Sequence, residues 1–326
     1  MSYTITQENF SNITSYRNNP DNNLKWSVPF ILPAWLEVWW QELSTEIEPS
    51  LNVIRKDEKI IGIAPLQVNN DVASFIGSTD VCDYLDFVVV PGMEENIFNV
   101  LLDDLKEKGI TKLDLKSLRP DSTVLTYLVN IAHIRGYKVS CHKEDVSVLM
   151  DLAPSWEDYL MALPKKQRHE VKRKLRRLFE AGKVEYHTIQ DKITANKTME
   201  IFLQMFTESR QDKAEFLTSQ RESFFRSLVD TMADIGLLRF GVLEIDTQPL
   251  AMVIYFDYND CIYLYNSGYE LKYNSLSVGL LCKVLCIKDN IQKNKKIFDF
   301  LKGDEIYKYR LGGKEINLSN CQIEIK

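Results

Sequence analysis

The stretch CIYLYNSGYELKYNSLSVGLLCKVLCIKDNIQKNKKIFDFL, from Cys261 to Leu301, decides the fold class. It opens with a run rich in Ile, Tyr and Leu, which predicts a strand. A polar loop of Asn and Ser follows and leads, near Ser277, into a mainly apolar segment of helical length. The β-rich run Lys296–Leu301 then predicts another strand. Strand, loop, helix and strand in this order are typical of a mixed α/β fold.

The sequence on either side of this stretch extends the pattern. Upstream, Leu237–Asp246 and Gln248–Tyr258 predict a β-hairpin, because two β-rich runs flank a short polar turn. Two helices precede it, Thr194–Arg210 and Glu222–Ile235. Downstream we expect a short helix within 304–311 and a terminal pair of strands, 314–319 and 321–326.

The first half of the chain repeats the order of these elements. It has two strands around the charged turn Lys56–Lys59, a β-rich run Tyr84–Val90 and a helix from Glu94 to Lys108 that Gly109 ends. A strand at 111–118, a helix ended by Gly136 and a further strand follow. Upstream, Trp35, Trp39 and Trp40 belong to a helix, where a packed face is the expected role. The sequence therefore predicts an α/β protein with mixed sheets and two tandem domains, 1–150 and 151–326.

Composition narrows the class of protein further. The 326 residues include 40 Lys and Arg against 46 Asp and Glu, a net charge of −6, so a generally basic nucleic-acid-binding protein is excluded. The opening MSYTITQENF lacks the features of a signal peptide, and no apolar run approaches the ~20 residues of a membrane span. We therefore expect a cytoplasmic protein with reduced thiols. All six cysteines are expected to be buried and unbridged: Cys82, Cys141, Cys261, Cys282, Cys286 and Cys321. The four histidines lack ligand spacing, so no metal site is expected.

One segment carries an unusual charge. Pro164–Lys183 contains nine basic and two acidic residues, a net charge of +7, in an acidic chain. Val171, Leu175, Leu178 and Phe179 follow helical spacing, so the segment predicts an amphipathic helix at the start of the second domain. Its basic face is either a solvated surface or a site for phosphates, RNA or an acidic surface.

Two places could carry chemistry. The loop that enters the helix at Ser277 offers backbone N–H groups and a helix dipole to a phosphate, although Ser277 could equally be a simple N-cap. The loop has neither the Walker A pattern nor GxGxxG. The second place is a polar cluster directly after a predicted strand, which offers acids, bases and oxyanion donors or merely a solvated helix. It comprises Asp299, Lys302, Asp304, Glu305, Tyr307, Lys308 and Arg310.

These elements resemble a known family. The hairpin, YLYNSGYE, the SVGLL helix and FDFLKGDEIYK follow the order found in acetyltransferases of the GNAT superfamily. The closer resemblance is to the CelD/BcsL-like branch, Acetyltransf_6, which is akin to the Fem peptidyltransferases. PKKQRHEVKRKLRRLFEAGKVE is similar to the opening of its catalytic domain, while LPAWLEVWW and GSTDVCDYLDFVV resemble its N-terminal half. The resemblance implies two tandem GNAT-like domains around a cleft, with the acyl donor in the C-terminal copy and the acceptor held by the N-terminal copy.

The resemblance also implies positions for the donor, an acyl-CoA. Its thioester would meet Tyr265, Asn266 and Ser267, and its pyrophosphate would lie on the loop and first helical turn. The residues of that loop and turn are Asn274, Ser275, Leu276, Ser277, Val278 and Gly279. This loop departs from the family pattern [RQ]xxGx[GA], because it has a single glycine. Acetyl-CoA is the default donor, while a longer acyl-CoA or an aminoacyl-tRNA stays open.

We assign roles in acyl transfer to these residues as hypotheses. Asp83 or Glu305 would deprotonate the acceptor amine, Lys308 would stabilise developing negative charge, and Tyr307 or Tyr265 would protonate the leaving thiolate. Arg168 and Lys302 would bind substrate. Asp299 is expected to brace a neighbouring lysine.

The leading reading is an N-acyltransferase acting on an amino sugar, a polysaccharide or cell-envelope precursor, or another small amine. One alternative is a Fem-like transferase that uses aminoacyl-tRNA; only that alternative implies RNA as a partner. The other is a non-catalytic accessory module of polysaccharide synthesis. The acceptor, the acyl chain and the oligomeric state are not evident from the sequence, nor is a peripheral membrane role for the basic helix.

Overall fold

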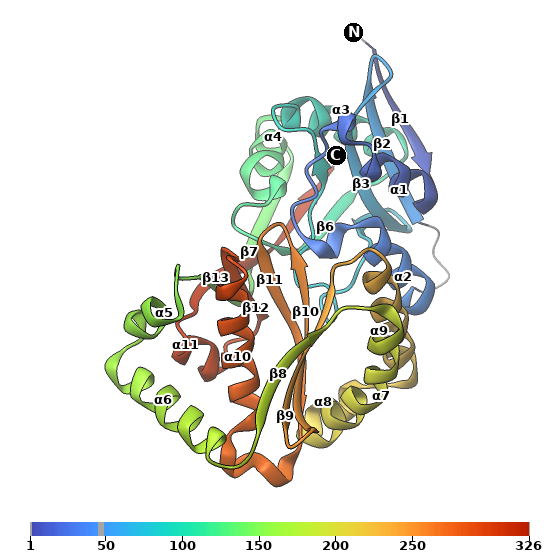
Figure 1. Cartoon of the computed structure of the whole chain (residues 1–326). Helices are drawn as coiled ribbons and strands as arrows, with labels where there is room; N and C mark the ends of the chain where they lie inside the picture. Colours follow the sequence, from blue (N-terminus) through green and yellow to red (C-terminus); the bar gives the residue numbers. More distant parts are fainter. Residues whose placement is uncertain (1, 45–48, 326) are drawn as a thin grey trace. The chain divides into compact units, whose positions relative to one another are not determined.

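The computed structural model describes residues 2–44 and 49–325, which form two compact units (Figure 1). The first unit comprises the described residues up to Val146 together with those from Ile316 onward, and the second is Ser147–Glu315. A linear division at 150/151 places the C-terminal strand in the second domain. The structure groups that strand with the first unit instead, because its backbone pairs there.

The first unit is built on a mostly antiparallel sheet with the order β1-β2-β3-β4-β6-β13, in which β4 and β6 are parallel. Its strands are β1 (Tyr3–Glu8), β2 (Pro49–Lys56), β3 (Lys59–Asn69), β4 (Val72–Phe75), β5 (Val88–Val89), β6 (Lys112–Leu118) and β13 (Lys314–Glu324). Its helices are α1 (Phe10–Asn18), α2 (Pro33–Leu43), α3 (Glu94–Glu107) and α4 (Val129–Ile134). It also has the short 3₁₀ helices η1 (Pro20–Asn22) and η2 (Pro29–Ile31) and a π-helix, η3 (Val124–Leu128), directly before α4. The expected long run Tyr84–Val90 forms only the two-residue strand β5.

The end of the chain corrects a prediction. The expected pair of terminal strands is one strand, β13, whose residues Cys321 and Ile323 lie opposite Leu115 and Leu113 of β6. Ser319 and Asn320 form an irregularity in the pairing with β6 rather than a hairpin turn, so the strand continues. Lys326, which the expected last strand included, lies outside the described residues.

The cysteines also differ from expectation. Cys141 and Cys321 form a disulfide across 180 residues of sequence, so the prediction of six unbridged thiols is wrong for this pair. Cys141 is exposed as well. The other four are free and buried, as predicted. The sequence offered no spacing signal for the bridge, because its two partners lie on different strands.

The expected packing of the tryptophan helix is confirmed. Trp35 and Trp39 of α2 are buried, and the Trp35 ring contacts Phe30 edge to face at 4.7 Å between ring centroids. The α3 face predicted from helical spacing is buried through Ile97, Leu101 and Leu105. Apolar packing therefore accounts for both helices.

The strands of the second unit follow the order β7-β12-β11-β10-β9-β8. The strand β7 (Lys138–Asp151) enters this unit at Ser147, and the others are β8 (Val184–Ile189), β9 (Leu238–Ile245), β10 (Gln248–Tyr258), β11 (Cys261–Tyr269) and β12 (Ile297–Lys302). Its helices are α5 (Trp156–Ala162), α6 (Lys165–Phe179), α7 (Lys192–Ser209), α8 (Gln211–Phe216), α9 (Ser219–Asp234), α10 (Val278–Gln292) and α11 (Ile306–Arg310). A 3₁₀ turn, η4 (Leu271–Leu276), precedes α10. The predicted hairpin and helices are present. The elements α5, β8 and α8 are additions that the sequence analysis did not predict.

Helices cover both sides of the sheet in this unit (Figure 1). One side packs on α10 through Leu281, Cys282 and Val284, all fully buried. On the other side α7 approaches β11 so closely that a Cβ on Gly268 would lie 2.7 Å from the backbone nitrogen of Phe206. Glycine at 268 therefore sets the distance between α7 and β11.

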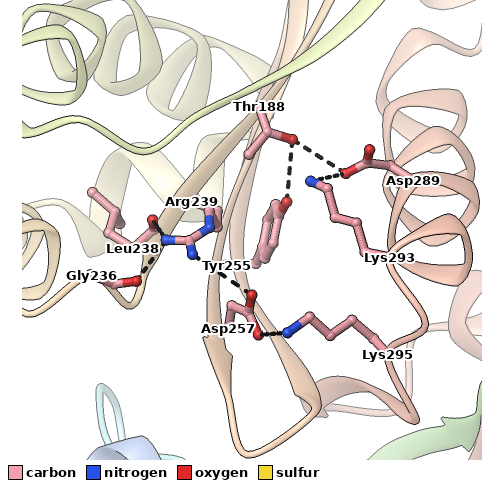
Figure 2. A network of polar contacts seen from close by, with 9 residues as sticks. All are labelled: Thr188, Gly236, Leu238, Arg239, Tyr255, Asp257, Asp289, Lys293 and Lys295. Atoms are coloured by element: carbon pink, nitrogen blue, oxygen red, sulfur yellow. Dashed lines mark hydrogen bonds and ion pairs between the residues drawn. The ribbon is translucent and has the colours of Figure 1, made fainter.

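A network of polar side chains connects neighbouring strands at the end of β10 (Figure 2). The Asp257 carboxylate pairs with Lys295 at 2.5 Å and with Arg239 at 3.7 Å. Beside it, the Thr188 hydroxyl donates to Asp289, which also pairs with Lys293 at 2.7 Å. These contacts connect β8, β9, β10, α10 and the segment after α10. Asp257 lies opposite Ile262, near the start of β11, whereas the polar residues Asn266 and Ser267 lie near its end.

Candidate active site

The sheet of the second unit opens between two parallel strands. The strands β11 and β12 pair only at Cys261–Tyr263 with Ile297–Asp299, although β11 continues to Tyr269 and β12 to Lys302. The pairing of β10 with β11 also shifts register here, passing over Tyr265. Ligands of α/β proteins bind outside the carboxyl ends of parallel strands, so the segment after Tyr263 is the place to look for a site.

The helix that follows β11 presents its N-terminus at this place. Ser277, which precedes α10, has a left-handed backbone with φ +57°, and among the described residues no side chain caps the helix. Lys174 of α6 donates a hydrogen bond of 2.7 Å to the Ser277 hydroxyl. The first N–H groups of a helix have no partner within it, and its dipole attracts anions. The basic helix and the loop named in the sequence therefore meet at one helix N-terminus.

Gly279 holds this helix end against β11. A Cβ at this position would lie 2.7 Å from the ring of Tyr269, the last residue of β11. The absence of a side chain lets the first turn of α10 contact the strand directly. The expected donor residues Tyr265, Asn266 and Ser267 lie on β11, while Asn274, Ser275 and Leu276 lie in η4 and Ser277, Val278 and Gly279 begin α10.

Lys308 lies beneath the turn that ends β12. Its side chain is buried, and its ammonium donates to the carbonyls of Leu301, Lys302 and Gly303 and pairs with Glu305 at 2.9 Å. Leu301 has a left-handed backbone with φ +62°, and its N–H donates to Asp299. Lys308 and Asp299 thus stabilise a strained turn through these hydrogen bonds.

Two further lysines, which the sequence analysis did not single out, lie near Ser267 and the start of α10. Lys213 of α8 donates to the Ser267 carbonyl and lies 4.7 Å from the centroid of the Phe206 ring. Lys283 of α10 donates to the Gly279 carbonyl at 3.1 Å. In the part of the chain that the structure describes, neither ammonium has a carboxylate at ion-pair distance.

Burial dominates the electrostatics of this lysine pair. Loss of solvation, with the charges of Lys283 and Arg210 in addition, lowers the pKa of Lys213 to about 7. Loss of solvation also lowers the pKa of Lys283 to about 8. At neutral pH Lys213 therefore exists in substantial part as a free amine, a form that can accept a proton.

The acid and base candidates from the sequence lie beside these lysines. Burial acts to raise the pKa of Glu305, but the charge and hydrogen bond of Lys308 outweigh it and hold the pKa below its usual value. Burial raises the pKa of Tyr307 above its usual range, so its hydroxyl keeps its proton at neutral pH. The ammonium of Lys283 lies 5.1 Å from the centroid of the Tyr307 ring.

The other expected site residues are more scattered. The ring of Tyr265 packs against Phe225 and Phe256. Arg168 lies on α6, where it donates to the backbone carbonyl and sulfur of Met161. Lys302 ends β12, and Asp83 belongs to the first unit. The geometry of the second unit thus joins Glu305, Tyr307 and Lys308 but does not involve Asp83.

Of the two lysines that the sequence analysis missed, Lys213 and Lys283, one could have been found from the sequence. Lys283 interrupts the apolar run VGLLCKVLC, in which a charged side chain has to lie against the core. Lys213 gave no such signal, because its neighbours Gln211, Asp212 and Glu215 are polar. Within residues 2–44 and 49–325, no cluster of three or more His, Cys, Asp or Glu side chains could hold a metal ion. No helix in the same ranges is long and apolar enough to cross a bilayer.

Known proteins of similar fold agree with this architecture. FemX superposes with a TM-score of 0.66 at 11% identity, over 98% of this chain and 96% of FemX. The C-terminal domain of a putative lysylphosphatidylglycerol synthetase from Agrobacterium fabrum gives 0.55 at 10% identity, over 85% and 83%. A tandem GNAT protein from the clavulanic acid biosynthesis pathway gives 0.51 at 10% identity, over 100% and 99%. At such identities these similarities establish the fold alone.

Comparison of the sequence with family models adds to the similarity in fold. No curated protein matches the chain in sequence. Residues 165–309 match the family model Acetyltransf_6, described as an acetyltransferase (GNAT) domain, from the start of the basic helix α6 to the end of the Lys308 turn. These residues are therefore similar to the GNAT acetyltransferase domain, and the fold is similar to that of FemX, in agreement with the resemblance seen in the sequence.

Proposed function

We propose that the chain is an N-acyltransferase that moves an acyl group from acyl-CoA to an amine. The observation that carries the proposal is the early end of the β11–β12 pairing, directly followed by the N-terminus of α10. An acyl thioester can lie along the free edge of β11 while its phosphates reach the helix N-terminus. Both halves of the donor then have a place within one unit.

The donor phosphates would lie at Ser277, Val278 and Gly279. Backbone N–H groups and the dipole of α10 favour an anion there, and Lys174 adds a positive charge next to Ser277. The thioester carbonyl would accept hydrogen bonds from backbone N–H groups between Tyr265 and Ser267. This arrangement would polarise the carbonyl as negative charge develops on its oxygen.

The reaction forms a C–N bond and breaks the C–S bond of the thioester. The amine attacks the carbonyl carbon and loses a proton, and the departing thiolate gains one, so the overall proton count balances. Tyr307 suits the second transfer because its hydroxyl keeps its proton; Tyr265 is the other candidate. No covalent enzyme intermediate is needed.

Three groups are candidates for the base that takes the proton from the amine. Glu305 is ionised, but it pairs with Lys308, which weakens it as a proton acceptor. Lys213 combines a pKa of about 7 with a position at Ser267. We therefore add Lys213 to Glu305 and Asp83, and assign Lys308 to the turn rather than to the developing charge.

The acceptor is proposed to be an amino sugar or another amine-bearing precursor of a polysaccharide or of the cell envelope. Arg168 and Lys302 are kept as candidates for binding an anionic group of the donor or acceptor. This part of the proposal is tested with a panel of amines that includes amino sugars and amino acids. Acyl-CoA consumption is followed by the release of free thiol.

Titration calorimetry tests the donor, with acetyl-CoA and a long-chain acyl-CoA in parallel. Saturable binding of either would support the proposal and identify the donor class. Binding of neither would refute it. A side chain at Gly279 would also displace the Tyr269 ring, so Lys174→Ala is the first variant to titrate, and a Gly279 variant needs a parallel measurement of stability.

A second candidate function is transfer of an aminoacyl group from aminoacyl-tRNA. The observation in its favour is the similarity to FemX across 98% of the chain. It predicts aminoacyl-tRNA binding that weakens as salt rises, together with failure to bind acyl-CoA. Incubation with labelled aminoacyl-tRNA and the same amine panel distinguishes the two donors.

A further inference from the structure

The outer face of α6 combines exposed cations with exposed apolar side chains. Helical spacing places Lys165, Arg168, Lys172, Arg176 and Phe179 along one side of α6, away from the buried residues Val171 and Leu178. Lys174 points the other way, towards Ser277 of the candidate active site. The outer face therefore does not include Lys174, the residue proposed to contact the donor phosphates.

Apolar side chains occupy this face together with the cations. Phe179 at the end of α6 is 53% exposed and Met161 at the end of α5 is 68% exposed. Arg168 donates to Met161, which fixes the tip of α5 beside the cations of α6. The helices also enclose a pocket of about 480 Å³ whose lining includes Trp156, Leu160 and Leu175. Met161, near the start of α6, and Phe179, at its end, are thus exposed apolar groups at either end of the row of cations.

The cations of this face are only weakly neutralised. Arg176 pairs with Glu180 at 3.7 Å, with both side chains about two-thirds exposed, so the pair contributes little. Glu170 is occupied by Arg173 at 2.8 Å. In the described part of the chain, Lys165 and Lys172 have no ion pair. The surface keeps a strong positive charge in a protein whose net charge is −6.

We propose that this face, made of Met161, Lys165, Arg168, Lys172, Arg176 and Phe179, docks the protein on an anionic lipid bilayer. Basic side chains are attracted to anionic headgroups, and apolar side chains between them enter the boundary of the acyl chains. RNA would use the cations, and an unpaired base can stack on Phe179, but RNA gives no role to the exposed Met161, which favours the bilayer. The candidate active site would then work beside a membrane surface.

Vesicle co-sedimentation of the full chain tests the proposal. The probes are vesicles of phosphatidylcholine alone and vesicles of phosphatidylcholine mixed with phosphatidylglycerol. We expect binding only to the anionic vesicles, weakening as salt rises. The double variant Lys165→Glu/Lys172→Glu should bind roughly tenfold more weakly, and Met161→Ser/Phe179→Ser should also lose binding.

Matched control variants make these losses specific. Lys197→Glu changes charge in the same direction at an exposed position of α7, and Ile193→Ser removes an apolar side chain that is 72% exposed. Both should bind the anionic vesicles like the parent. All variants change exposed side chains, and thermal unfolding checks that each is folded.

Several outcomes would overturn the proposal. Binding to neither vesicle, or equal binding to both, would exclude anionic lipid as the partner. Equal losses in the control variants would exclude this face. Binding of labelled tRNA that the Lys165→Glu/Lys172→Glu variant loses, without vesicle binding, would assign the face to RNA. Acyl-CoA titration of the same variants separates docking from the proposed donor binding, which should be unchanged.

Discussion

Lys174 of α6 donates a hydrogen bond of 2.7 Å to the hydroxyl of Ser277, the residue that precedes α10. This contact joins two features that are 103 residues apart in sequence. It divides the basic helix into an inner side, which faces the helix N-terminus, and an outer side, which carries Lys165, Lys172 and Phe179. A single charged helix can thereby serve two separate tasks.

The first prediction concerns the inner side. Lys174→Ala removes the ammonium beside Ser277, and we expect acyl-CoA to bind roughly tenfold more weakly, about 1.4 kcal/mol. Arg177→Ala, an exposed position of the same helix, should bind acyl-CoA like the parent. Titration calorimetry at fixed salt measures both. Equal affinities for parent and Lys174→Ala would remove Lys174 from the phosphate site.

The second prediction concerns the turn after β12. Lys308→Met leaves the carbonyls of Leu301 and Gly303 without their donor and Glu305 without its partner. We expect a loss of about 2–4 kcal/mol in the free energy of unfolding, measured by urea denaturation. Lys314→Met, at an exposed position, should unfold like the parent. A stable but inactive Lys308→Met protein would instead support a catalytic role for Lys308.

The third prediction is a pH dependence of stability that Lys213 causes. Its pKa in the folded chain is about 7, against 10.5 ordinarily. Between these values the unfolded chain binds a proton that the folded chain lacks, so the free energy of unfolding rises with pH. Below about pH 7 both states are protonated and this rise is absent.

Lys283 also makes the free energy of unfolding rise with pH, from about pH 8. Because the Lys213→Met variant keeps Lys283, the difference between parent and variant isolates the effect of Lys213. The difference in unfolding free energy between parent and variant should change steadily from about pH 7 to 10 and be level below pH 7. Denaturant titrations across this range measure it. A difference that is independent of pH would show that Lys213 is solvated in the folded protein.

These lysines also show what the sequence could and could not reveal. The spacing of apolar residues was enough to predict α3, α6, α10 and the β9–β10 hairpin, because local periodicity decides such elements. The burial of Lys213 depends on a carbonyl of β11, and that of Lys308 on carbonyls of the turn that ends β12. The placement of β13 beside β6 and the Cys141–Cys321 bridge depend on pairing between distant strands, for which a single sequence carries no signal.

The candidate site was predicted to a similar extent. The loop from Asn274 to Gly279 was recognised because a polar segment before an apolar helix is a local pattern, and the structure places it after β11. The early end of the β11–β12 pairing was not predicted. The family resemblance implied only that the thioester would meet Tyr265, Asn266 and Ser267. Glu305 and Lys308 were singled out as reacting groups, whereas their mutual ion pair gives them a structural task that the sequence did not indicate.

The last prediction compares two glycines of the site. A Cβ at Gly268 would meet backbone atoms of Met205 and Phe206 at 2.7–2.8 Å, whereas at Gly279 it would meet the ring of Tyr269. A side-chain ring can rotate, but the backbone of α7 moves only if the helix shifts. We therefore expect Gly268→Ala to lower the free energy of unfolding by about 1–3 kcal/mol, and Gly279→Ala by less.

The same pair of variants separates packing from donor binding. Gly279→Ala should weaken acyl-CoA binding more than it lowers stability, because the displaced Tyr269 ring and the new methyl group lie at the proposed phosphate position. Gly268→Ala should lower stability more than it weakens acyl-CoA binding. Denaturant unfolding and calorimetry on both proteins provide the four values. Equal ratios of binding loss to stability loss in the two variants would contradict the assignment of the α10 N-terminus to the donor.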